Sequence, residues 1–399
     1  MLATEKQYVQ WHENGNLRQA CWLSESNQAA PARIVVIDDT TSADEAYRLA
    51  CAGTSMLWHG DFQNARQLLQ ALTRRIERSE ERKISKAAKA HQSEKPITEP
   101  LATSKKIPNL FHQQRQAQAQ RSRLLSRLLL ALDAGYISPL RRAPDVSAAC
   151  TAAFGELDES CLISFRDLQG ALGAAGWRAK GVPIANLGLS IFPHYGVFAP
   201  TRHEYVQLLL DAPLPNQADI AFDIGTGTGL LAIVLAQRGV KQIIATDLNP
   251  RALACAHENF ERLALSNVQL QQADLYPTDV PLTNLIVCNP PWLPAKPTSP
   301  LEFAVYDANS AMLRGFLQGA TQYLAEQGEI WLILSDLAEH LQLRSRDELL
   351  GWFADARLAV KYRLDTTPKH NRSQDNSDPL FAARSSEITS LWCLVPFKN

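Results

Sequence analysis

The stretch ADIAFDIGTGTGLLAIVLAQ, residues 218–237, decides how this chain of 399 residues folds. It begins with an apolar run typical of a buried strand, passes through glycines at 225, 227 and 229, and continues as an apolar helical pattern. Glycines permit a tight turn, and they let a ligand approach the backbone beside the positive end of the following helix. The stretch therefore predicts a strand, a ligand-binding loop and a helix in succession.

The residues after this stretch repeat the alternation of strand and helix. We predict further strands at 241–246, 268–272, 284–288, 329–334, 358–366 and 387–397. We predict helices at 250–263 and near 309–325. Alternation at this spacing is typical of a parallel sheet covered by helices on both faces. Ligands of such sheets bind at the carboxyl ends of the strands.

Three acids stand at the ends of successive predicted strands: Asp223, Asp247 and Asp274. Asp223 would repel a pyrophosphate but would hold a ligand that carries an ammonium group. A dinucleotide fingerprint fits less well, because its third glycine would fall at position 230, which is Leu. The acids therefore favour a nucleoside that bears an amino acid.

Four motifs together resemble those of the class I methyltransferases that use S-adenosylmethionine. They are FDIGTGTG (222–229), ATDLNP (245–250), QADL (272–275) and CNPPW (288–292). The resemblance covers residues 190 to 399. It implies an α/β, Rossmann-like fold with a seven-stranded, mostly parallel sheet whose last strand is antiparallel.

The resemblance also implies S-adenosylmethionine as the cofactor and assigns it contacts. In that family the residue matching Asp223 lies near the methionine amine, the one matching Asp247 binds the ribose hydroxyls, and the one matching Asp274 lies by the adenine. The residues expected to bind the cofactor are Asp223, Gly225, Thr226, Gly227, Gly229, Asp247, Leu248, Asp274 and Asn289.

The loop formed by Asn289, Pro290, Pro291 and Trp292 is expected to be catalytic. Its prolines have no N–H, and Pro290 restricts Asn289 to an extended conformation, so the loop offers mostly hydrogen-bond acceptors. The carboxamide oxygen of Asn289 and the carbonyl of Pro290 can accept hydrogens from an NH2 group and turn its lone pair toward an incoming methyl group. Trp292 can stack on the flat group that carries the amine.

In family terms, this loop resembles the signature of enzymes that methylate exocyclic amines of bases in DNA or RNA, or side-chain amides of glutamine in proteins. The segment YGVFAPTRHEYVQLL (195–209) resembles the one that precedes the fold in ribosomal RNA guanine-N2 and protein-glutamine methyltransferases. There, Thr201, Arg202 and Glu204 would lie near the cofactor or the acceptor. Trp292 replaces the Tyr that is usual in glutamine methyltransferases, which weakens that assignment.

The rest of the chain differs in composition. We predict a small α/β domain at 1–78, a basic polar linker at 79–108 that is helical in part at its start, a helical substrate-recognition region at 109–190 and the methyltransferase domain at 191–399. Residues 66–142 contain 17 Lys and Arg but 6 Asp and Glu, a surplus of 11. Such a surplus can neutralise phosphates, although arginines on the polar side of an amphipathic helix are also commonly just solvated.

The composition excludes several classes of protein. With 46% hydrophobic and 20% charged residues, the chain is typical of globular proteins, and no apolar run approaches the ~20 residues of a membrane span. The first residues lack a secretory pattern, so we predict a cytoplasmic protein. The seven cysteines are far apart and form no CxxC pair, which predicts neither disulfides nor a metal site.

These features predict an S-adenosylmethionine-dependent N-methyltransferase that acts on a base amine of structured RNA, with ribosomal RNA as the leading target. The alternative is a protein N5-glutamine methyltransferase that acts on a translation factor or a ribosomal protein. A non-catalytic RNA-binding protein with this fold is disfavoured because Asp223, Asp247 and Asn289 are all present. Neither a membrane nor a metal is a predicted partner.

Overall fold

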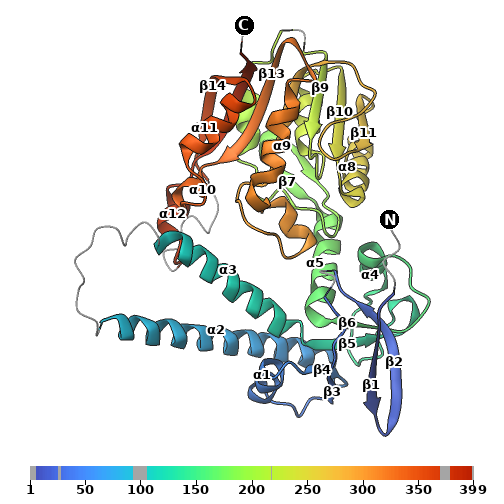
Figure 1. Cartoon of the computed structure of the whole chain (residues 1–399). Helices are drawn as coiled ribbons and strands as arrows, with labels where there is room; N and C mark the ends of the chain where they lie inside the picture. Colours follow the sequence, from blue (N-terminus) through green and yellow to red (C-terminus); the bar gives the residue numbers. More distant parts are fainter. Residues whose placement is uncertain (1–5, 26–27, 93–105, 217, 369–377, 398–399) are drawn as a thin grey trace. The chain divides into compact units, whose positions relative to one another are not determined.

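The structure of the protein is a computed structural model, which describes residues 6–25, 28–92, 106–216, 218–368 and 378–397. The chain divides into two compact units (Figure 1). Unit 1 comprises Met1–Thr103 and His112–Gly176, and unit 2 comprises Ser104–Phe111 and Trp177–Asn399. Each unit has its own sheet and its own hydrophobic core.

Unit 1 is built on a mixed sheet with the strand order β1-β2-β6-β5-β4-β3. Its strands are β1 (Tyr8–Glu13), β2 (Asn16–Leu23), β3 (Ile34–Ile37), β4 (Ser55–Trp58), β5 (Leu128–Leu132) and β6 (Cys161–Ser164). Its helices are α1 (Ala43–Cys51), α2 (Phe62–Gln92), α3 (Lys106–Leu125), the 3-10 helix η2 (Ala134–Tyr136), α4 (Ser147–Phe154) and α5 (Phe165–Lys180). The first turns of α3 and the last turn of α5 belong to unit 2.

The amino-terminal half differs from its predicted organisation. Helix α2 continues to Gln92, well inside the predicted linker 79–108, and residues 93–105 of that linker lie outside the described residues. The predicted helical region 109–190 contains strands as well, because β5 pairs with β4 and β6 pairs with β2. The run Leu128–Leu132 is a buried central strand, which hydrophobic periodicity alone does not separate from a short buried helix.

Unit 2 contains a second sheet, with the strand order β11-β10-β9-β12-β13-β15-β14. Its strands are β9 (Ile220–Ile224), β10 (Gln242–Asp247), β11 (Val268–Gln272), β12 (Thr283–Cys288), β13 (Leu324–Ser335), β14 (Leu358–Thr366) and β15 (Thr389–Pro396). Strands β9, β10, β11, β12 and β13 are parallel to one another, whereas β15 is antiparallel to both β13 and β14. The predicted seven-stranded, Rossmann-like fold is therefore confirmed.

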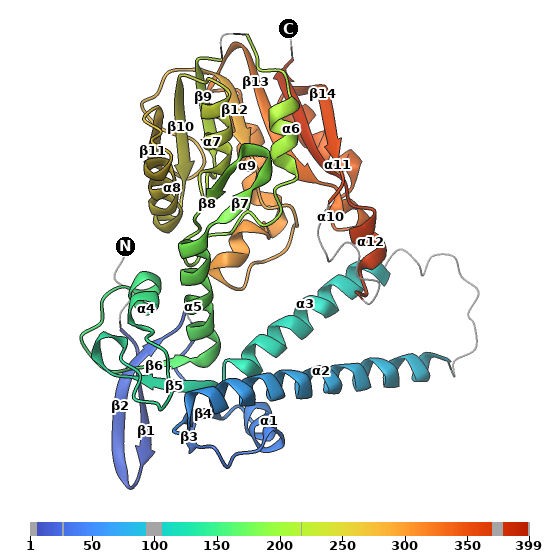
Figure 2. The ribbon, with the colours of Figure 1, turned by 180° about the vertical axis from the view of Figure 1, so that it is seen from behind.

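Helices cover both faces of this sheet (Figure 2). They are α6 (Tyr205–Asp211), α7 (Leu230–Gln237) and α8 (Pro250–Arg262) on one face and α9 (Ala311–Ala320) and α11 (Arg346–Asp355) on the other. The short helices α10 (Leu337–His340) and α12 (Phe381–Ser385) pack together in a separate cluster. Three short 3-10 helices, η3 (Ala185–Leu187), η4 (Pro300–Ala304) and η5 (Ala308–Ser310), lie in loops, and β7 (Val182–Ile184) pairs with β8 (Leu189–Ile191).

The alternation of side chains along each strand builds the two halves of the core. Ala221 and Val287 pack in one cluster with helices α6, α7 and α8, while their neighbours Phe222 and Ile286 pack in the other with α9 and α11. Because β9 is buried on both faces, its sequence reads as a continuous apolar run rather than an alternating one. Parallel pairing then brings the carboxyl ends of β9, β10, β11 and β12 to one edge of the sheet.

Gly229, which precedes α7, offers a test of this packing. Its φ is +85°, and a Cβ there would lie 2.5 Å from Cε1 of Phe260. We expect Gly229→Ala to lower the free energy of unfolding by about 1–3 kcal/mol, because it combines backbone strain with overpacking. Unfolding in urea measures the change. Gly239→Ala is the matched control, since Gly239 has a φ of +89° with nothing within 4 Å of its Cβ position; equal losses in the two variants would exclude the contact with Phe260 as the cause.

Candidate functional site

The glycine loop after β9 is held by the end of β10. The N–H groups of Gly225 and Thr226 donate to the carbonyl of Thr246, at 2.9 and 2.8 Å. The N–H of Gly227 donates to Oδ2 of Asp247 at 3.0 Å. The loop is therefore fixed before any ligand arrives. A Cβ at Gly227 would meet nothing within 4 Å, so this side of the loop is open to a ligand.

Asp223 lies beneath this loop and is fully buried. Its Oδ2 accepts hydrogen bonds from the Thr226 hydroxyl at 2.6 Å and from the Ala232 N–H at 3.1 Å, whereas Oδ1 has no partner. Burial raises the pKa of Asp223 to about 7, because the charged form loses its hydration, and the nearby Asp247 adds to the rise. A buried oxygen without a donor suits a ligand that brings an ammonium group, as the predicted cofactor does.

Asp247 ends β10 with both carboxylate oxygens partly used. Oδ1 accepts the N–H of Asn249 at 2.8 Å, and Oδ2 accepts that of Gly227. Each oxygen keeps a second lone pair, which could accept a ribose hydroxyl. Burial raises the pKa of Asp247 as well. Leu248 is 63% exposed beside it, and Asp274, which follows β11, is also exposed.

The acceptor loop follows β12, the strand next to β9. The indole Nε1 of Trp292 donates to the carboxamide Oδ1 of Asn289 at 2.9 Å. The carboxamide is thus oriented by the indole. One lone pair of Oδ1 remains for a substrate. Pro290 is buried and Pro291 is half-buried.

Arg202 covers part of Trp292. The centre of its guanidinium lies 5.0 Å from the centroid of the indole ring, a cation–π distance. The guanidinium is bound by two carboxylates, Glu204 at 3.1 Å and Glu387 at 2.9 Å. The aromatic surface that we predicted for stacking is therefore shared with a guanidinium. Thr201, the third residue of the predicted set, is exposed.

Glu387 was missed by the sequence reasoning. Its side chain is buried, and its Oε1 accepts from the hydroxyl of Ser335 at 2.6 Å as well as from Arg202, while Oε2 has no partner. Ser335 ends β13, and Glu387 precedes β15, so the two meet only because these strands pair. The sequence offered one signal for Glu387, an acidic residue directly before the apolar strand β15, because a buried carboxylate needs partners.

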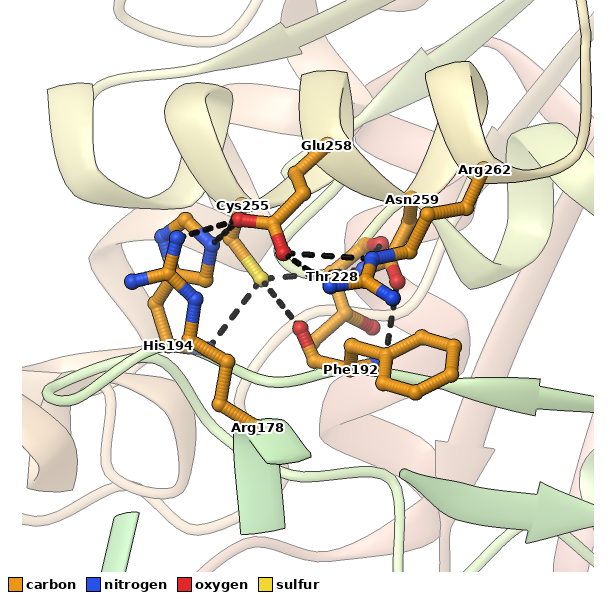
Figure 3. Close-up of polar contacts among 8 residues, drawn as sticks. All are labelled: Arg178, Phe192, His194, Thr228, Cys255, Glu258, Asn259 and Arg262. Carbon is orange, nitrogen blue, oxygen red and sulfur yellow. Dashed lines mark hydrogen bonds and ion pairs between the residues drawn. The ribbon is translucent and has the colours of Figure 1, made fainter. Parts of the chain in front are cut away.

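A second group of side chains supports the glycine loop from the side of α8 (Figure 3). Asn259 donates from Nδ2 to the carbonyl of Thr228 at 3.0 Å and accepts the N–H of Phe192 at 2.8 Å. The N–H of His194 points to Sγ of Cys255 at 3.4 Å. Asn259 therefore joins the glycine loop to the chain that leads into the fold from β8.

Glu258 holds the segment around His194 through charged contacts. Its carboxylate binds Arg178 and Arg262, the latter at 2.8 Å, and it lies 2.7 Å from Nε2 of His194 (Figure 3). The hydrogen bonds from these groups outweigh partial burial and lower the pKa of Glu258 to about 2. Burial lowers the pKa of His194. The anchor therefore holds as an arginine–carboxylate contact across neutral pH.

No group of three or more His, Cys, Asp and Glu side chains within the described residues is arranged to hold a metal ion. None of the helices in the same residues is long and apolar enough to cross a membrane.

Known proteins match this chain in the region of the site. The family model of the methyltransferase small domain matches residues 188–361. A tRNA1(Val) (adenine(37)-N6)-methyltransferase of Parabacteroides distasonis is 30% identical over 175 residues, which cover 42% of this chain and 73% of the relative. A relative of the same name from Actinobacillus pleuropneumoniae is 40% identical over 32% of this chain and 57% of its own length.

A release factor glutamine methyltransferase of Cereibacter sphaeroides is also similar. It is 32% identical over 31% of this chain and 49% of its own length. The chain thus spans about half the length of several curated relatives. Similarity extends to proteins with an RNA acceptor and to proteins with a glutamine acceptor.

Because burial raises the pKa of Asp223, we expect the binding of S-adenosylhomocysteine, the product formed from the cofactor, to depend on pH. An ammonium group is attracted to the ionised carboxylate, so binding should release a proton wherever free Asp223 is protonated. We expect the affinity for S-adenosylhomocysteine to rise with pH up to about 7, by at most about tenfold per unit, and then to level off. Calorimetry between about pH 5.5 and 8.5 measures this. Asp223→Asn should abolish the slope and Asp274→Asn should keep it; a wild-type affinity independent of pH would contradict the assignment.

The bond between Trp292 and Asn289 predicts the effect of Trp292→Phe. This change keeps an aromatic ring but removes the N–H that orients the Asn289 oxygen. We expect kcat to fall roughly fivefold to tenfold, the worth of one hydrogen bond, with unchanged affinity for S-adenosylhomocysteine. Steady-state kinetics and calorimetry together check this. An unchanged kcat with a raised KM would instead indicate that stacking is the main role of the ring.

Proposed function

Since the chain belongs to the methyltransferase small domain family of class I S-adenosylmethionine-dependent methyltransferases, we propose that it methylates an exocyclic amine of a base in RNA. Ribosomal RNA is the target we test first, and tRNA is the second. Membership confirms the predicted family and the predicted enzyme class, an N-methyltransferase. The acceptor is our proposal: the orientation of the Asn289 carboxamide by Trp292 supports an NH2 group, and the positive charge of residues 66–142 supports RNA.

The residues at the sheet edge fit the cofactor that the family implies. Asp223 offers a buried oxygen without a partner, Asp247 offers two lone pairs, and Gly227 leaves room where a side chain would stand. These residues would hold the methionine amine, the ribose and the chain between them. The exposed Leu248 would cover one face of the adenine. When bound, S-adenosylmethionine supplies a methyl group on a positively charged sulfur.

The acceptor loop performs the part of the reaction that this chain controls. Asn289 Oδ1 and the Pro290 carbonyl would accept the two hydrogens of an NH2 group, which takes the nitrogen lone pair out of conjugation. The hydrogen bond from Trp292 holds the carboxamide, so little reorientation is required when the amine arrives. The loop supplies no strong base, and none is required, because the proton can pass to water after the nitrogen has been methylated.

An RNA acceptor is supported by charge. Most of residues 66–142, which carry a surplus of 11 positive charges, belong to unit 1. The site in unit 2 does not need these charges to bind an amine. Phosphate contacts position a nucleic acid without reading its sequence, and they account for much of its affinity. A glutamine in a folded protein would bring no comparable negative charge.

A glutamine amide is the second candidate. It is supported by the release factor glutamine methyltransferase among the relatives, and an amide NH2 presents the same two hydrogens to Asn289 as a base amine. This candidate predicts N5-methylglutamine in a release factor or a ribosomal protein. Mass spectrometry of these proteins from a strain without the gene, compared with its parent, separates it from the RNA proposal.

The proposal is tested by incubating the purified chain with labelled S-adenosylmethionine and ribosomal RNA or tRNA from the strain without the gene. We expect label in a base methylated on its exocyclic amine after digestion to nucleosides. Ribosomal proteins and release factors from the same strain form the parallel reaction. Label in protein with none in either RNA would overturn the RNA proposal and establish the second candidate.

Asn289→Ala tests which residue holds the amine. We expect kcat to fall by at least about 100-fold, as when one preorganised hydrogen-bonding group is removed from an active site, with the affinity for S-adenosylhomocysteine changed by less than about threefold. Labelled methyl transfer and calorimetry provide the two readouts. Asn186→Ala is the control, since Asn186 is exposed and donates a hydrogen bond to the exposed Gln207 at 3.0 Å. Near-normal turnover of Asn289→Ala would remove Asn289 from the chemistry.

A further inference from the structure

Helix α2 carries a row of exposed side chains in unit 1 that we name the arginine ridge. It consists of Arg66, Gln70, Arg74, Arg78 and Arg82, each four residues after the one before, and all are exposed. Residues at this spacing form one ridge on the surface of a helix. Each step rises by about 6 Å, so the ridge extends for about 24 Å.

The opposite side of α2 fixes the direction of the ridge. Phe62, Leu69, Leu72 and Ile76 are buried in the core of unit 1. A helix held by four buried apolar side chains keeps its other face toward solvent. The ridge is therefore a fixed feature of unit 1 rather than the surface of a loose helix.

No carboxylate among the described side chains forms an ion pair with a ridge arginine. Other basic residues nearby are paired, with Arg75 bound to Asp44 and Arg121 bound to Glu77. Across the part of the chain that the structure describes, no ion pair or side-chain hydrogen bond involves a ridge arginine. The exposed side chains of α2 that the structure describes are all Arg or Gln. Four guanidinium groups therefore face solvent, and none of them is paired with a described carboxylate.

Helix α3 adds a polar surface of the same kind. Its sequence from Lys106 to Leu125 contains no Asp or Glu, and within unit 1 its exposed side chains include Gln113, Gln116, Gln118, Gln120 and Arg123. The ion pair of Arg121 with Glu77 joins α3 to α2 within unit 1. Glutamine amides donate hydrogen bonds to phosphate oxygens and accept them from ribose hydroxyls. The two helices thus combine unpaired positive charge with neutral donors.

We propose that the arginine ridge binds the phosphate backbone of RNA. The inference rests on the proposed function in one respect, that the acceptor is RNA. Regular positive charges over a length of about 24 Å suit a polymer with a charge on every unit. Guanidinium groups bind phosphate with two parallel hydrogen bonds, and no described side chain occupies the donors of the ridge arginines. The ridge would supply affinity, while base recognition stays with the pocket of unit 2.

The test replaces three ridge arginines in the full chain, Arg74→Gln, Arg78→Gln and Arg82→Gln together. Glutamine keeps the helix, because its helix propensity is close to that of arginine. The control triple is Arg18→Gln, Arg33→Gln and Arg48→Gln, which removes three exposed arginines of unit 1 from other elements. The probes are a fluorescein-labelled 20-nucleotide oligouridylate and bulk tRNA, each titrated at several salt concentrations.

We expect the ridge triple to bind the oligouridylate at least about tenfold more weakly at low salt. Its plot of log affinity against log salt should be shallower by about 2, because each phosphate contact on a single strand contributes about 0.7 to the slope. The control triple should keep the affinity and slope of the wild type. Equal losses in the two triples, or a ridge triple that binds like the wild type, would overturn the proposal.

Further measurements separate this proposal from the proposed function. Polyglutamate as a competitor should displace RNA poorly; competition equal to that of RNA would show a surface for acidic polymers in general and would overturn the assignment. If the wild type methylates RNA while the ridge triple binds RNA normally, the function stands and the ridge proposal fails. If the ridge triple loses RNA binding but the wild type methylates protein alone, the ridge proposal stands and the proposed acceptor fails.

Discussion

The candidate site depends on one constraint, the attachment of the glycine loop to the end of β10. The carbonyl of Thr246 and the carboxylate of Asp247 together accept three N–H groups of the loop, from Gly225, Thr226 and Gly227. These bonds set the position of the loop above Asp223, whose own oxygen is bound by Thr226. They also use three N–H groups of the loop, which are then not available to a ligand. The unpaired oxygen of Asp223 and the lone pairs of Asp247 remain available.

The sequence predicts this edge well because its signals are local. Asp223, Gly225 and Asp247 each stand within a few residues of an apolar strand, and parallel pairing brings strand ends together without further information. The sequence places Asn289 at the same edge for the same reason, since it follows β12 directly. The sequence also contains the support for Asn289, because Trp292 is three residues away and reaches Oδ1 within the same loop.

Other features depend on contacts between distant residues, which the sequence does not display. Glu387 meets Ser335 and Arg202 only after β15 has inserted beside β13, so its burial could not be read from its neighbours. The strand β5 was interpreted as helix because five apolar residues fit both structures. Asn259 is a polar residue of α8, and its role appears only once Phe192 and Thr228 lie on either side of it.

The charges around Trp292 explain how binding could be divided between the units. Two carboxylates, those of Glu204 and Glu387, surround the single guanidinium of Arg202, so the three side chains together carry a net negative charge. A phosphate would be repelled there, whereas an amine or a ring N–H that donates hydrogen would be favoured. The site around Trp292 therefore suits the part of the methylated molecule that donates hydrogen bonds, and it does not suit a phosphate backbone. An RNA substrate requires its phosphates to be held elsewhere in the chain, and the unpaired arginines of α2 provide charge of the required sign.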